Sequence, residues 1–594
     1  MPLAELKYIA GTIKEPQNTK STEASWQETS LVHFPDNKLT PIPSFVASTG
    51  GAGSLALQGT CRAQWAGRLG GTYAGAYYLF GTHSHLFAEY NAIRYNMTPL
   101  VTSGTTIAAS IATTNLSTTV VFTAAAHGQS VGDRVKITGA ADTGGILAAT
   151  LNKEHIITAI TAGSFSIVAG TAATSTVSGG GGASTAYFKQ IASGNQNQTF
   201  LSGYGAGLYG SGIYGANRFS STAQSYPRIW SFDNFGNKFI MCPGDYAAGN
   251  GQKIYLWDGD RAVAPAPLDN SIFPDAPTNC NWVAVVANQI VALCGTNIVI
   301  ATTDPTTGGA VFPTVPATTA FGDVIPVQRS TRLLSVAAFG EKSAIVFAPE
   351  PLLLRLVGGV WDLVELGVEY PIISPSAFCK FNDGIIWYAQ DGNYYFCNGG
   401  PVKQIINRQN GEYVRGRMNQ NAIWTSFMMS DQKHNQAWHY YPSTGEVNPD
   451  SYVIFNPANE SFTLGEQSRT SAQRPSVIDQ RFYTTNITNV YATFSQQTAS
   501  FNWSAKTAFF YIEPGYRFKM TRMYPDMVGE ASVKIIGREY PQSNDIDYGT
   551  YSITTGSTIM TVRGAGGLFA LEFSGTSDFT LGSLKFQVER AGRR

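Results

Sequence analysis

The chain has 594 residues, of which 13% are charged and 12% are aromatic, and its formal net charge is zero. This length exceeds what one compact core accommodates and predicts three or four structural units. The aromatic content argues against a disordered chain, and the neutral balance argues against a dedicated nucleic-acid binder with a basic surface.

The sequence gives little indication of export, membrane insertion or disulfide bonding. The start of the chain lacks the pattern of a signal peptide, and no run of about 18 apolar residues could cross a membrane. Six cysteines are scattered without a C-x-x-C pair, which argues against a zinc ribbon or a dense disulfide scaffold. We expect a soluble protein without stable membrane insertion whose cysteines are mostly reduced: Cys61, Cys242, Cys280, Cys294, Cys379 and Cys397.

The first hundred residues form an N-terminal segment that leads into the main domain. Residues 1–60 are polar and rich in turn-forming residues, and residues 61–100 alternate in the manner of β-strands. We therefore predict that 1–100 contains the N-terminal segment and the first strands of a propeller.

The composition changes abruptly after Pro99. Residues 101–182 are rich in Thr, Ala and Ser and almost free of aromatics. Alternation at 134–138, 154–160 and 164–168, broken by glycine-containing turns, predicts short strands. We assign 101–195 to a small inserted β-barrel or sandwich domain.

Residues 203–215 form a glycine–aromatic repeat, GYGAGLYGSGIYG. Its three tyrosines, Tyr204, Tyr209 and Tyr214, are five residues apart, so they do not share one face of a strand. The segment is interpreted as an ordered loop with aromatic anchors, either a contact surface or a packed linker.

A complete antiparallel β-unit follows at 230–260. It contains an aromatic-rich strand, a turn at Asn234 to Asn237, an apolar strand at 238–242 and a third strand before an Asp-Gly turn. Degenerate copies begin at Trp282, Leu333, Phe378 and His434, and this recurrence predicts a β-propeller over 196–475. The alternative is an irregular set of β-sandwich hairpins.

Residues 406–426 interrupt this pattern and are the best helical candidate. Their arginines Arg408, Arg415 and Arg417 could line a charged channel, although a solvated helix face is the commoner explanation. A β-rich C-terminal segment, 476–594, is expected to complete the propeller or a platform, with strands near 509–512, 531–537, 558–562, 568–573 and 584–589.

The common catalytic motifs are missing from the sequence: it has no G-x-S-x-G, H-E-x-x-H or P-loop pattern. His83 and His85 would share one face of a strand and could begin a metal site, but no nearby acid or cysteine completes it. We assign no catalytic, cofactor-binding or metal residue and expect no cofactor.

Because some propellers are glycosidases, the carboxylates also need consideration. A retaining glycosidase requires two carboxyl groups about 5 Å apart. Candidates are Asp233, Asp258, Asp391 and Glu412, whose convergence the sequence does not predict. The stretch 231–236 resembles a sialidase Asp-box, but its glycine falls one position late and the Thr-Trp is missing, so we interpret it as an ordinary turn and expect no enzyme.

Several weak motifs occur in one order along nearly the whole chain. They lie at 81–99 (GT, LF and YNMTP), 203–215, 230–236 (WSFDNFG), 438–442 (WHYYP), 452–456 (YVIFN), 524–526 (YPD), 537–541 (GREYP) and 591–594 (AGRR). This collinear set resembles the tail nozzle proteins of short-tailed bacteriophages, also called tail tubular protein B or packaged-DNA stabilisation proteins. The chain departs from the family pattern at Asn96 and Met97.

The resemblance implies a structural virion protein rather than an enzyme. Such proteins form a homo-oligomeric ring, a hexamer, below the portal and adaptor rings, where they close the channel, retain the packaged double-stranded DNA and conduct it during ejection. Expected partners are the adaptor protein, tail fibres or spikes, a tail needle, and viral DNA held by non-specific contact. The expected location is the virion tail, after synthesis in the cytoplasm of a bacterial host.

Two alternatives from other classes stay open. A receptor-binding or glycan-degrading phage tail protein would act on host glycans and form a trimer. A free-standing propeller interaction module would be monomeric and would not bind viral rings.

Overall fold

The computed structural model describes most of the chain. The described residues are 3–6, 8–12, 24–42, 46–48, 50–191, 193–198, 225–246, 252–268, 276–301, 321–327, 332–381, 384–405, 408–432, 434–457, 460–473, 483–486, 490–492 and 502–593. The glycine–aromatic stretch 203–215 lies outside them.

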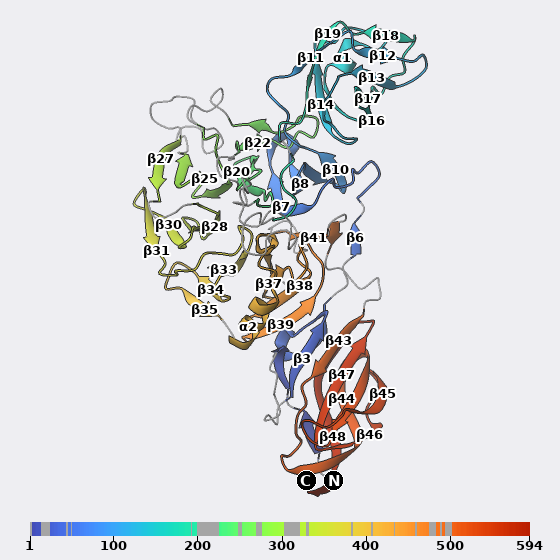
Figure 1. The fold of residues 1–594 in the computed structure, drawn as a ribbon, viewed down its shortest axis with the longest axis vertical. Coiled ribbons are helices and arrows are strands. Elements are labelled where there is room, and N and C mark those ends of the chain that lie inside the picture. Colours follow the sequence, from blue (N-terminus) through green and yellow to red (C-terminus); the bar gives the residue numbers. More distant parts are fainter. Residues whose placement is uncertain are drawn as a thin grey trace, which may run out of the picture.

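The fold is almost entirely β and has three parts that follow one another along the longest axis of the molecule (Figure 1). A small two-sheet domain lies at one end, a β-propeller lies in the middle, and a large sheet that contains both chain ends lies at the other end. We call these parts the inserted domain, the propeller and the platform. The expected all-β class with a propeller-like core is confirmed.

Within the described residues, the propeller consists of seven antiparallel four-stranded sheets, which are its blades. Blades 1 to 6 follow in chain order, apart from the inserted domain between blades 1 and 2. Blade 1 has β7 (Cys61–Leu69), β8 (Gly75–Thr82), β9 (Leu86–Tyr90) and β10 (Ile93–Asn96). Blade 2 has β20 (Ser231–Phe235), β21 (Lys238–Cys242), β22 (Tyr255–Trp257) and β23 (Ala266–Pro267).

Blade 3 has β24 (Trp282–Val286), β25 (Gln289–Cys294), β26 (Asn297–Ala301) and β27 (Phe321–Pro326). Blade 4 has β28 (Ser335–Phe339), β29 (Ser343–Phe347), β30 (Leu352–Val357) and β31 (Val360–Glu365). Blade 5 has β32 (Phe378–Phe381), β33 (Gly384–Tyr388), β34 (Tyr394–Cys397) and β35 (Lys403–Ile405).

Blade 6 has β36 (Phe427–Asp431), β37 (Gln436–Tyr441), β38 (Ser451–Asn456) and β39 (Ser461–Glu466). Blade 7 has β40 (Ser471–Ala472), β41 (Tyr483–Thr485) and β42 (Val490–Ala492), so the propeller continues beyond the predicted boundary at residue 475. Its fourth strand is β6 (Val46–Ser48), which pairs with β42 although it precedes blade 1 in the chain.

The first strands of the blades form a closed ring around the propeller axis. β7 contacts β20, β20 contacts β24, and the contacts continue through β28, β32, β36 and β40 back to β7. Because β6 completes the last blade, the N-terminal segment fastens the ring where the chain would otherwise leave it open.

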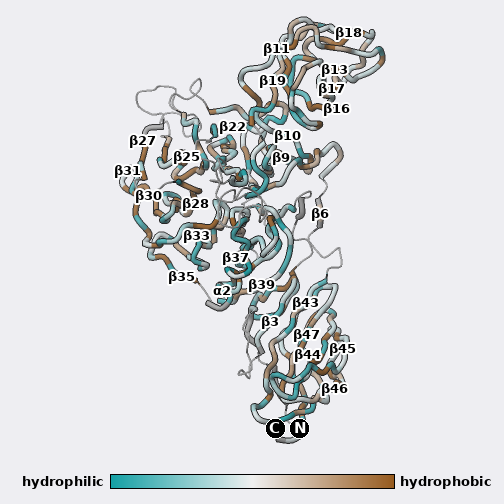
Figure 2. The backbone as a smooth tube through the Cα atoms, viewed as in Figure 1, coloured by the Kyte–Doolittle hydropathy of each residue, from teal (hydrophilic) through white to brown (hydrophobic). Residues whose placement is uncertain are grey.

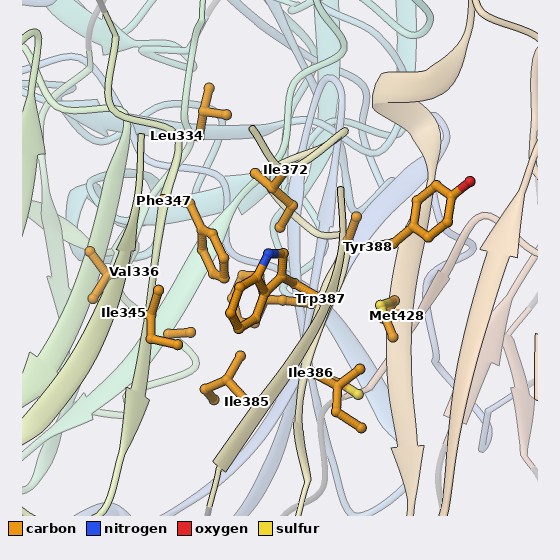
Figure 3. Close-up of a cluster of buried hydrophobic side chains, with 14 of the residues drawn as sticks. Leu334, Val336, Ile345, Phe347, Ile372, Ile385, Ile386, Trp387, Tyr388 and Met428 are labelled. Atoms are coloured by element: carbon orange, nitrogen blue, oxygen red, sulfur yellow. The ribbon is translucent and has the colours of Figure 1, made fainter. Parts of the chain in front are cut away.

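The blade interiors are packed with aromatic and aliphatic side chains. Strand β33 is buried at every position, and its Trp387 lies between residues of neighbouring blades such as Phe347 and Met428 (Figure 3). The rings of Trp387 and Phe347 meet edge to face at 5.7 Å between centroids. Figure 2 shows hydrophobic and hydrophilic residues interspersed along the strands of all three parts, as expected for sheets with one covered face.

The inserted domain is a two-sheet β-structure with its own core. One sheet has β11 (Thr105–Ala108), β14 (Arg134–Thr138), β15 (Glu154–Ile156) and β19 (Ala183–Tyr187). The other has β12 (Ile111–Thr113), β13 (Thr119–Thr123), β16 (Ala159–Thr161), β17 (Ser164–Val168) and β18 (Val177–Gly180). Both sheets contribute residues to a core built around Phe122 and Phe165, which stack at 5.2 Å.

Hydrogen bonds from a buried ion pair of the inserted domain fix this domain to the propeller. The side chain of Arg134 pairs with Glu154 at 2.6 Å and donates to the backbone oxygens of Asn96 and Arg261 in the propeller. The other carboxylate contact of Glu154 is with the backbone N–H of Ala264, at 3.0 Å. These contacts cross the junction in both directions, so the two parts form a stiff joint.

The platform is a nine-stranded sheet made from both ends of the chain. The N-terminal strands are β1 (Leu3–Leu6), β2 (Tyr8–Thr12) and β3 (Ala24–Ser30). The C-terminal strands are β43 (Trp503–Thr507), β44 (Tyr516–Arg538), β45 (Ile546–Thr554), β46 (Met560–Gly566), β47 (Leu568–Gly575) and β48 (Phe579–Arg593). A short ladder, β4 (Val32–His33) with β5 (Thr40–Pro41), leads towards the propeller.

The platform is joined to blade 6 by backbone and hydroxyl contacts. The N–H of Leu31 donates to the hydroxyl of Tyr452 at 3.0 Å, and the amide of Asn456 donates to the backbone oxygen of Phe34 at 3.0 Å. The hydroxyl of Thr12 accepts from the N–H of Leu464 at 3.2 Å. These hydrogen bonds hold the platform against blade 6.

Helices are short in the described part of the chain. They are α1 (Ala148–Leu151), α2 (Arg408–Arg417), and the 3-10 turns η1 (Pro35–Asn37), η2 (Gly71–Tyr73) and η3 (Ile423–Thr425). Among the described helices none is long and apolar enough to cross a membrane. The expected helix at 406–426 is present as α2 but ends nine residues earlier than predicted, at Arg417.

Candidate functional site

The main cavity of the described structure lies inside the ring of first strands. Its volume is about 650 Å³, within the range typical of small-molecule sites. Six of the seven first strands supply its wall, and we call this cavity the propeller channel. Its lining includes Trp65, Phe232, Asp233, Trp282, Val336, Phe378, Lys380, Phe381, Asp431 and Asn435.

The acidic side chains of the channel already have partners. The carboxylate of Asp233 accepts from the N–H groups of Val285 and Asn234, both at 2.8 Å, so it ties blade 2 to blade 3. Asp431 is 1% exposed, and its Oδ2 lies 2.6 Å from Nδ1 of His434. These contacts give both carboxylates a structural role in holding the ring together.

A second, smaller cavity of about 30 Å³ adjoins the channel along the same axis. Trp65 and Phe232 line both spaces. The wall of the small cavity combines polar and apolar residues. Its polar lining residues are Arg62, Gln64, Ser231, Ser376 and Ser471.

The residues near the axis carry several buried polar atoms that have no protein partner in the described structure. They include Nη1 of Arg62, Oε1 of Gln64 and Oγ of Ser430. Buried polar atoms are normally hydrogen-bonded to protein or ordered water. The axis of the propeller is therefore suited to hold water or a small polar ligand.

The two histidines His83 and His85 have separate hydrogen-bond partners. His85 lies between Ser84 (Oγ to Nδ1, 2.8 Å) and the buried carboxylate of Asp133 (Nε2 to Oδ1, 2.5 Å), whereas Nδ1 of His83 accepts from the N–H of Thr60 at 3.0 Å. Burial alone would raise the pKa of Asp133, but hydrogen bonds from His85 and from the Ser130 N–H hold it below its ordinary value. The described residues contain no cluster of three or more metal-ligating side chains.

The four candidate carboxylates occupy separate places. Asp233 lies in the propeller channel, Asp258 lies in the turn after β22, Asp391 lies in the turn after β33, and Glu412 is on α2. Asp258 caps its own turn by accepting from the N–H of Asp260, and Asp391 accepts from the hydroxyl of Tyr395 at 2.6 Å. The structure therefore does not place any two of these four carboxylates on opposite sides of a shared cavity, as a glycosidase pair requires.

Arg415 and Arg417 of α2 lie outside the propeller channel. Arg417 pairs with Glu466 at the end of β39, the outermost strand of blade 6, at 3.2 Å. Arg415 is exposed and donates to the backbone oxygen of Asp391. The side chain of Arg408 lies outside the described part of the structure. A channel lined by this helix would have to be one formed between subunits.

Arg62 is the functional candidate that sequence reasoning missed. Its only sequence signal is a charged residue within the alternating strand CRAQW, and such residues usually face solvent. Its burial depends on the backbone of Gln196 and on Asn448, which are distant in the sequence, so the local pattern does not predict it.

Comparisons with known proteins assign no function to this chain. No protein-family model matches the chain, and no curated protein matches it. Among solved structures it is similar to the computationally designed Ika8 protein, with 9% identity and a TM-score of 0.31 over 75% of this chain and 98% of that one.

Two further similar structures are natural proteins. BamB from Moraxella catarrhalis has 8% identity and a TM-score of 0.25, over 45% of this chain and 82% of its own. A glycoside hydrolase family 43 arabinoxylan arabinofuranohydrolase from Bacillus subtilis has 10% identity and a TM-score of 0.22, over 61% of this chain and 95% of its own. Similarities at this level carry no argument about activity.

Proposed function

We propose that this chain is a structural protein of a phage tail, a nozzle subunit that forms a hexameric ring below the portal and adaptor rings. In this role it closes the DNA channel, retains the packaged genome and conducts it during ejection. The proposal rests on the collinear motifs described above. One structural observation gives it additional support.

That observation is the linear order of three β-domains with stiff joints between them (Figure 1). Arg134 and Glu154 fix one joint, and Leu31 with Tyr452 fixes part of the other. A subunit of this shape can form the wall of a tube, because hydrogen bonds across both joints hold its three parts together. Repetition of one contact between such subunits closes a ring when the rotation fits.

The position of the DNA path follows from the size of the propeller channel. A cavity of about 650 Å³ fits a small molecule and is far too small for a double helix. In the proposed assembly DNA therefore passes between subunits, through a lumen formed by the ring. Surface residues of each subunit, rather than the propeller axis, meet the duplex.

The contacts within the lumen should be weak and independent of sequence. Strong phosphate binding would slow ejection, and the formal net charge of zero is compatible with few phosphate contacts. The gate is expected to consist of loops that project into the lumen, and the adaptor and fibres are expected to dock on the outer surfaces.

A structural role accounts for the channel carboxylates better than catalysis does. Asp233 and Asp431 are engaged with backbone N–H groups and with His434, and neither is placed as a free acid or base. We therefore do not propose a glycan-degrading activity.

Depletion of the protein during infection tests the proposal. Particles assembled in a host that cannot make this chain should package DNA but lose it on mild heating, and supply of the chain from a plasmid should restore retention. If depleted particles keep their DNA and fail only to adsorb to cells, the chain is a receptor-binding protein and the proposal is wrong.

A further inference from the structure

Two cysteine side chains meet at one end of the β24–β25 hairpin in blade 3. Cys280 lies two residues before β24, and Cys294 is the last residue of β25. Their Sγ atoms are 2.9 Å apart, and both thiols are free. A disulfide bond is roughly 2.05 Å long, so a small rotation of the side chains brings the two sulfurs to bonding distance.

The backbone holds the two cysteines in this position. The N–H of Asn281, which follows Cys280, donates to the oxygen of Leu293, which precedes Cys294, at 2.8 Å. Cys280 also exchanges two backbone hydrogen bonds of 2.8 Å with Gln252, in the loop between β21 and β22 of blade 2. These bonds hold the backbone around both residues, so the two thiols stay neighbours in the folded chain.

The two thiols differ in their access to solvent. Cys280 is 0% exposed and belongs to the hydrophobic core between blades 2 and 3, whereas Cys294 is only partly buried. Burial raises the pKa of the Cys280 thiol well above its ordinary value, and the thiolate is the reactive form. Reaction with a reagent from solution therefore begins at Cys294, and Cys280 is the second thiol to react.

From this geometry we propose that Cys280 and Cys294 form a reversible disulfide bond when the protein meets a low-molecular-weight disulfide such as oxidised glutathione. The thiolate of Cys294 attacks one sulfur of this disulfide, whose S–S bond breaks, and one glutathione thiolate leaves. Cys280 then loses its proton and attacks Sγ of Cys294, which releases the second glutathione. Together the two protein thiols give up two electrons and two protons, and one glutathione disulfide becomes two glutathione thiols.

The bond ties the end of the hairpin at the place where blade 3 meets blade 2. It joins residues 14 positions apart, so it restricts the unfolded chain and stabilises the folded one. A reducing compartment such as the cytoplasm keeps the pair as thiols, and the bond closes outside such a compartment. This inference does not depend on whether the chain is a nozzle protein.

Peptide mapping without reduction tests the bond directly. The full-length protein is incubated with excess oxidised glutathione or with dithiothreitol, and free thiols are then blocked with iodoacetamide in denaturant. Chymotrypsin cuts after Trp282, between the two cysteines. We expect the peptides of Cys280 and Cys294 to be joined after glutathione and separately alkylated after dithiothreitol. Alkylation of both after either treatment, a glutathione adduct that remains on Cys294, or a bond of either cysteine to Cys242 would overturn the proposal.

Thermal stability gives a second readout. Oxidised wild-type protein should melt a few degrees above the reduced protein. The variant Cys294→Ser should lose this difference, whereas the control Cys397→Ser, which removes a buried cysteine of blade 5, should keep it. An equal difference in the wild type and Cys294→Ser would contradict the assignment, and if Cys294→Ser does not fold, the peptide map of the wild type decides.

Discussion

Ala47 pairs with Tyr491 across the antiparallel ladder that closes the seven-bladed ring, although 444 residues separate them in the sequence. The same ladder pairs Val46 with Ala492 and Ser48 with Val490. The N-terminal segment thus contributes to two distant places, the platform through β1 to β3 and the last blade through β6. Integrity of the propeller should depend on this three-residue strand.

The double variant Val46→Pro with Ala47→Pro should open the ring. In an antiparallel strand alternate N–H groups face one neighbour, so one of two consecutive prolines must remove a donor that faces β42. We expect a loss of at least about 1 kcal/mol in the free energy of unfolding, measured by chemical denaturation. Ala47→Val, which keeps the N–H and suits a strand, is the control, and equal stability of the two variants would contradict the closure role.

The joint of the inserted domain should depend on the Arg134–Glu154 pair. Arg134→Met leaves the carboxylate of Glu154 buried without its cation, which typically costs about 3–5 kcal/mol. Limited proteolysis should then cut the junction sooner than in the wild type. The double variant Arg134→Met with Glu154→Met removes both charges and should recover much of the lost stability. If the double variant is as unstable as Arg134→Met alone, the loss comes from altered packing and not from the unpaired carboxylate.

Acidification should destabilise the fold through His439. This side chain is fully buried, and burial lowers its pKa to about 3 from the ordinary 6.5. Below about pH 6.5 the unfolded chain binds a proton at this histidine, whereas the folded chain does not. The contribution of His439 to the free energy of unfolding is therefore complete above about pH 6.5 and is lost as the pH falls towards 3. The loss at pH 5 should be about 2 kcal/mol.

A paired substitution isolates this effect. The hydroxyl of Tyr394 lies 2.8 Å from Nδ1 of His439, so His439→Phe with Tyr394→Phe removes both polar partners together. Denaturation curves from pH 7 to pH 4 should be flatter for this variant than for the wild type. An unchanged slope would show that other groups dominate the acid sensitivity.

The thiols should be slow to react in the native state. Burial raises the pKa of Cys242 to about 12 and also raises the pKa values of Cys61 and Cys397, and the thiolate is the reactive form. Mass spectrometry after treatment with iodoacetamide at pH 8 should find these three residues unmodified in native protein and modified in denaturant. Rapid native labelling of Cys242 would contradict its buried position.

Charge reversal on α2 tests whether this helix faces the proposed lumen. Arg415 and Arg417 are exposed, so Arg415→Glu with Arg417→Glu should leave the fold intact. If these residues line the ring lumen, heat-induced release of DNA from particles should change. The matched control is Arg355→Glu, which breaks a surface ion pair with Asp362 on blade 4. Equal DNA leakage from wild-type particles, particles with the double variant and particles with the control variant would show that α2 does not face the DNA.

Local sequence patterns predicted many of the strands but not their long-range partners. The apolar strand at 238–242 and the alternating strands at 134–138 and 164–168 appear with the predicted bounds, because an apolar run and an alternating pattern are both local signals. The expected strand at 509–512 is wrong: Phe510 forms only an isolated bridge with Phe569. The assignment of β6 to blade 7 depends on pairing over more than four hundred residues, which leaves no local trace.

The candidate site was less predictable than the fold. Asp233 is one of four carboxylates that the sequence offers for a glycosidase pair, and the structure shows that it accepts backbone N–H groups of Asn234 and of Val285 in the next blade. Arg62 was not singled out, because neither its burial nor its neutral acceptors at Gln196, Asn197 and Asn448 can be inferred from neighbouring residues.

The central claim is that this chain forms a nozzle ring, and imaging of the purified protein with a mass determination tests it most directly. The protein is examined alone and mixed with the assembled portal and adaptor rings of its virus. The account predicts a sixfold ring with a central channel that caps this complex. A monomer or trimer that does not bind the portal and adaptor rings would contradict it.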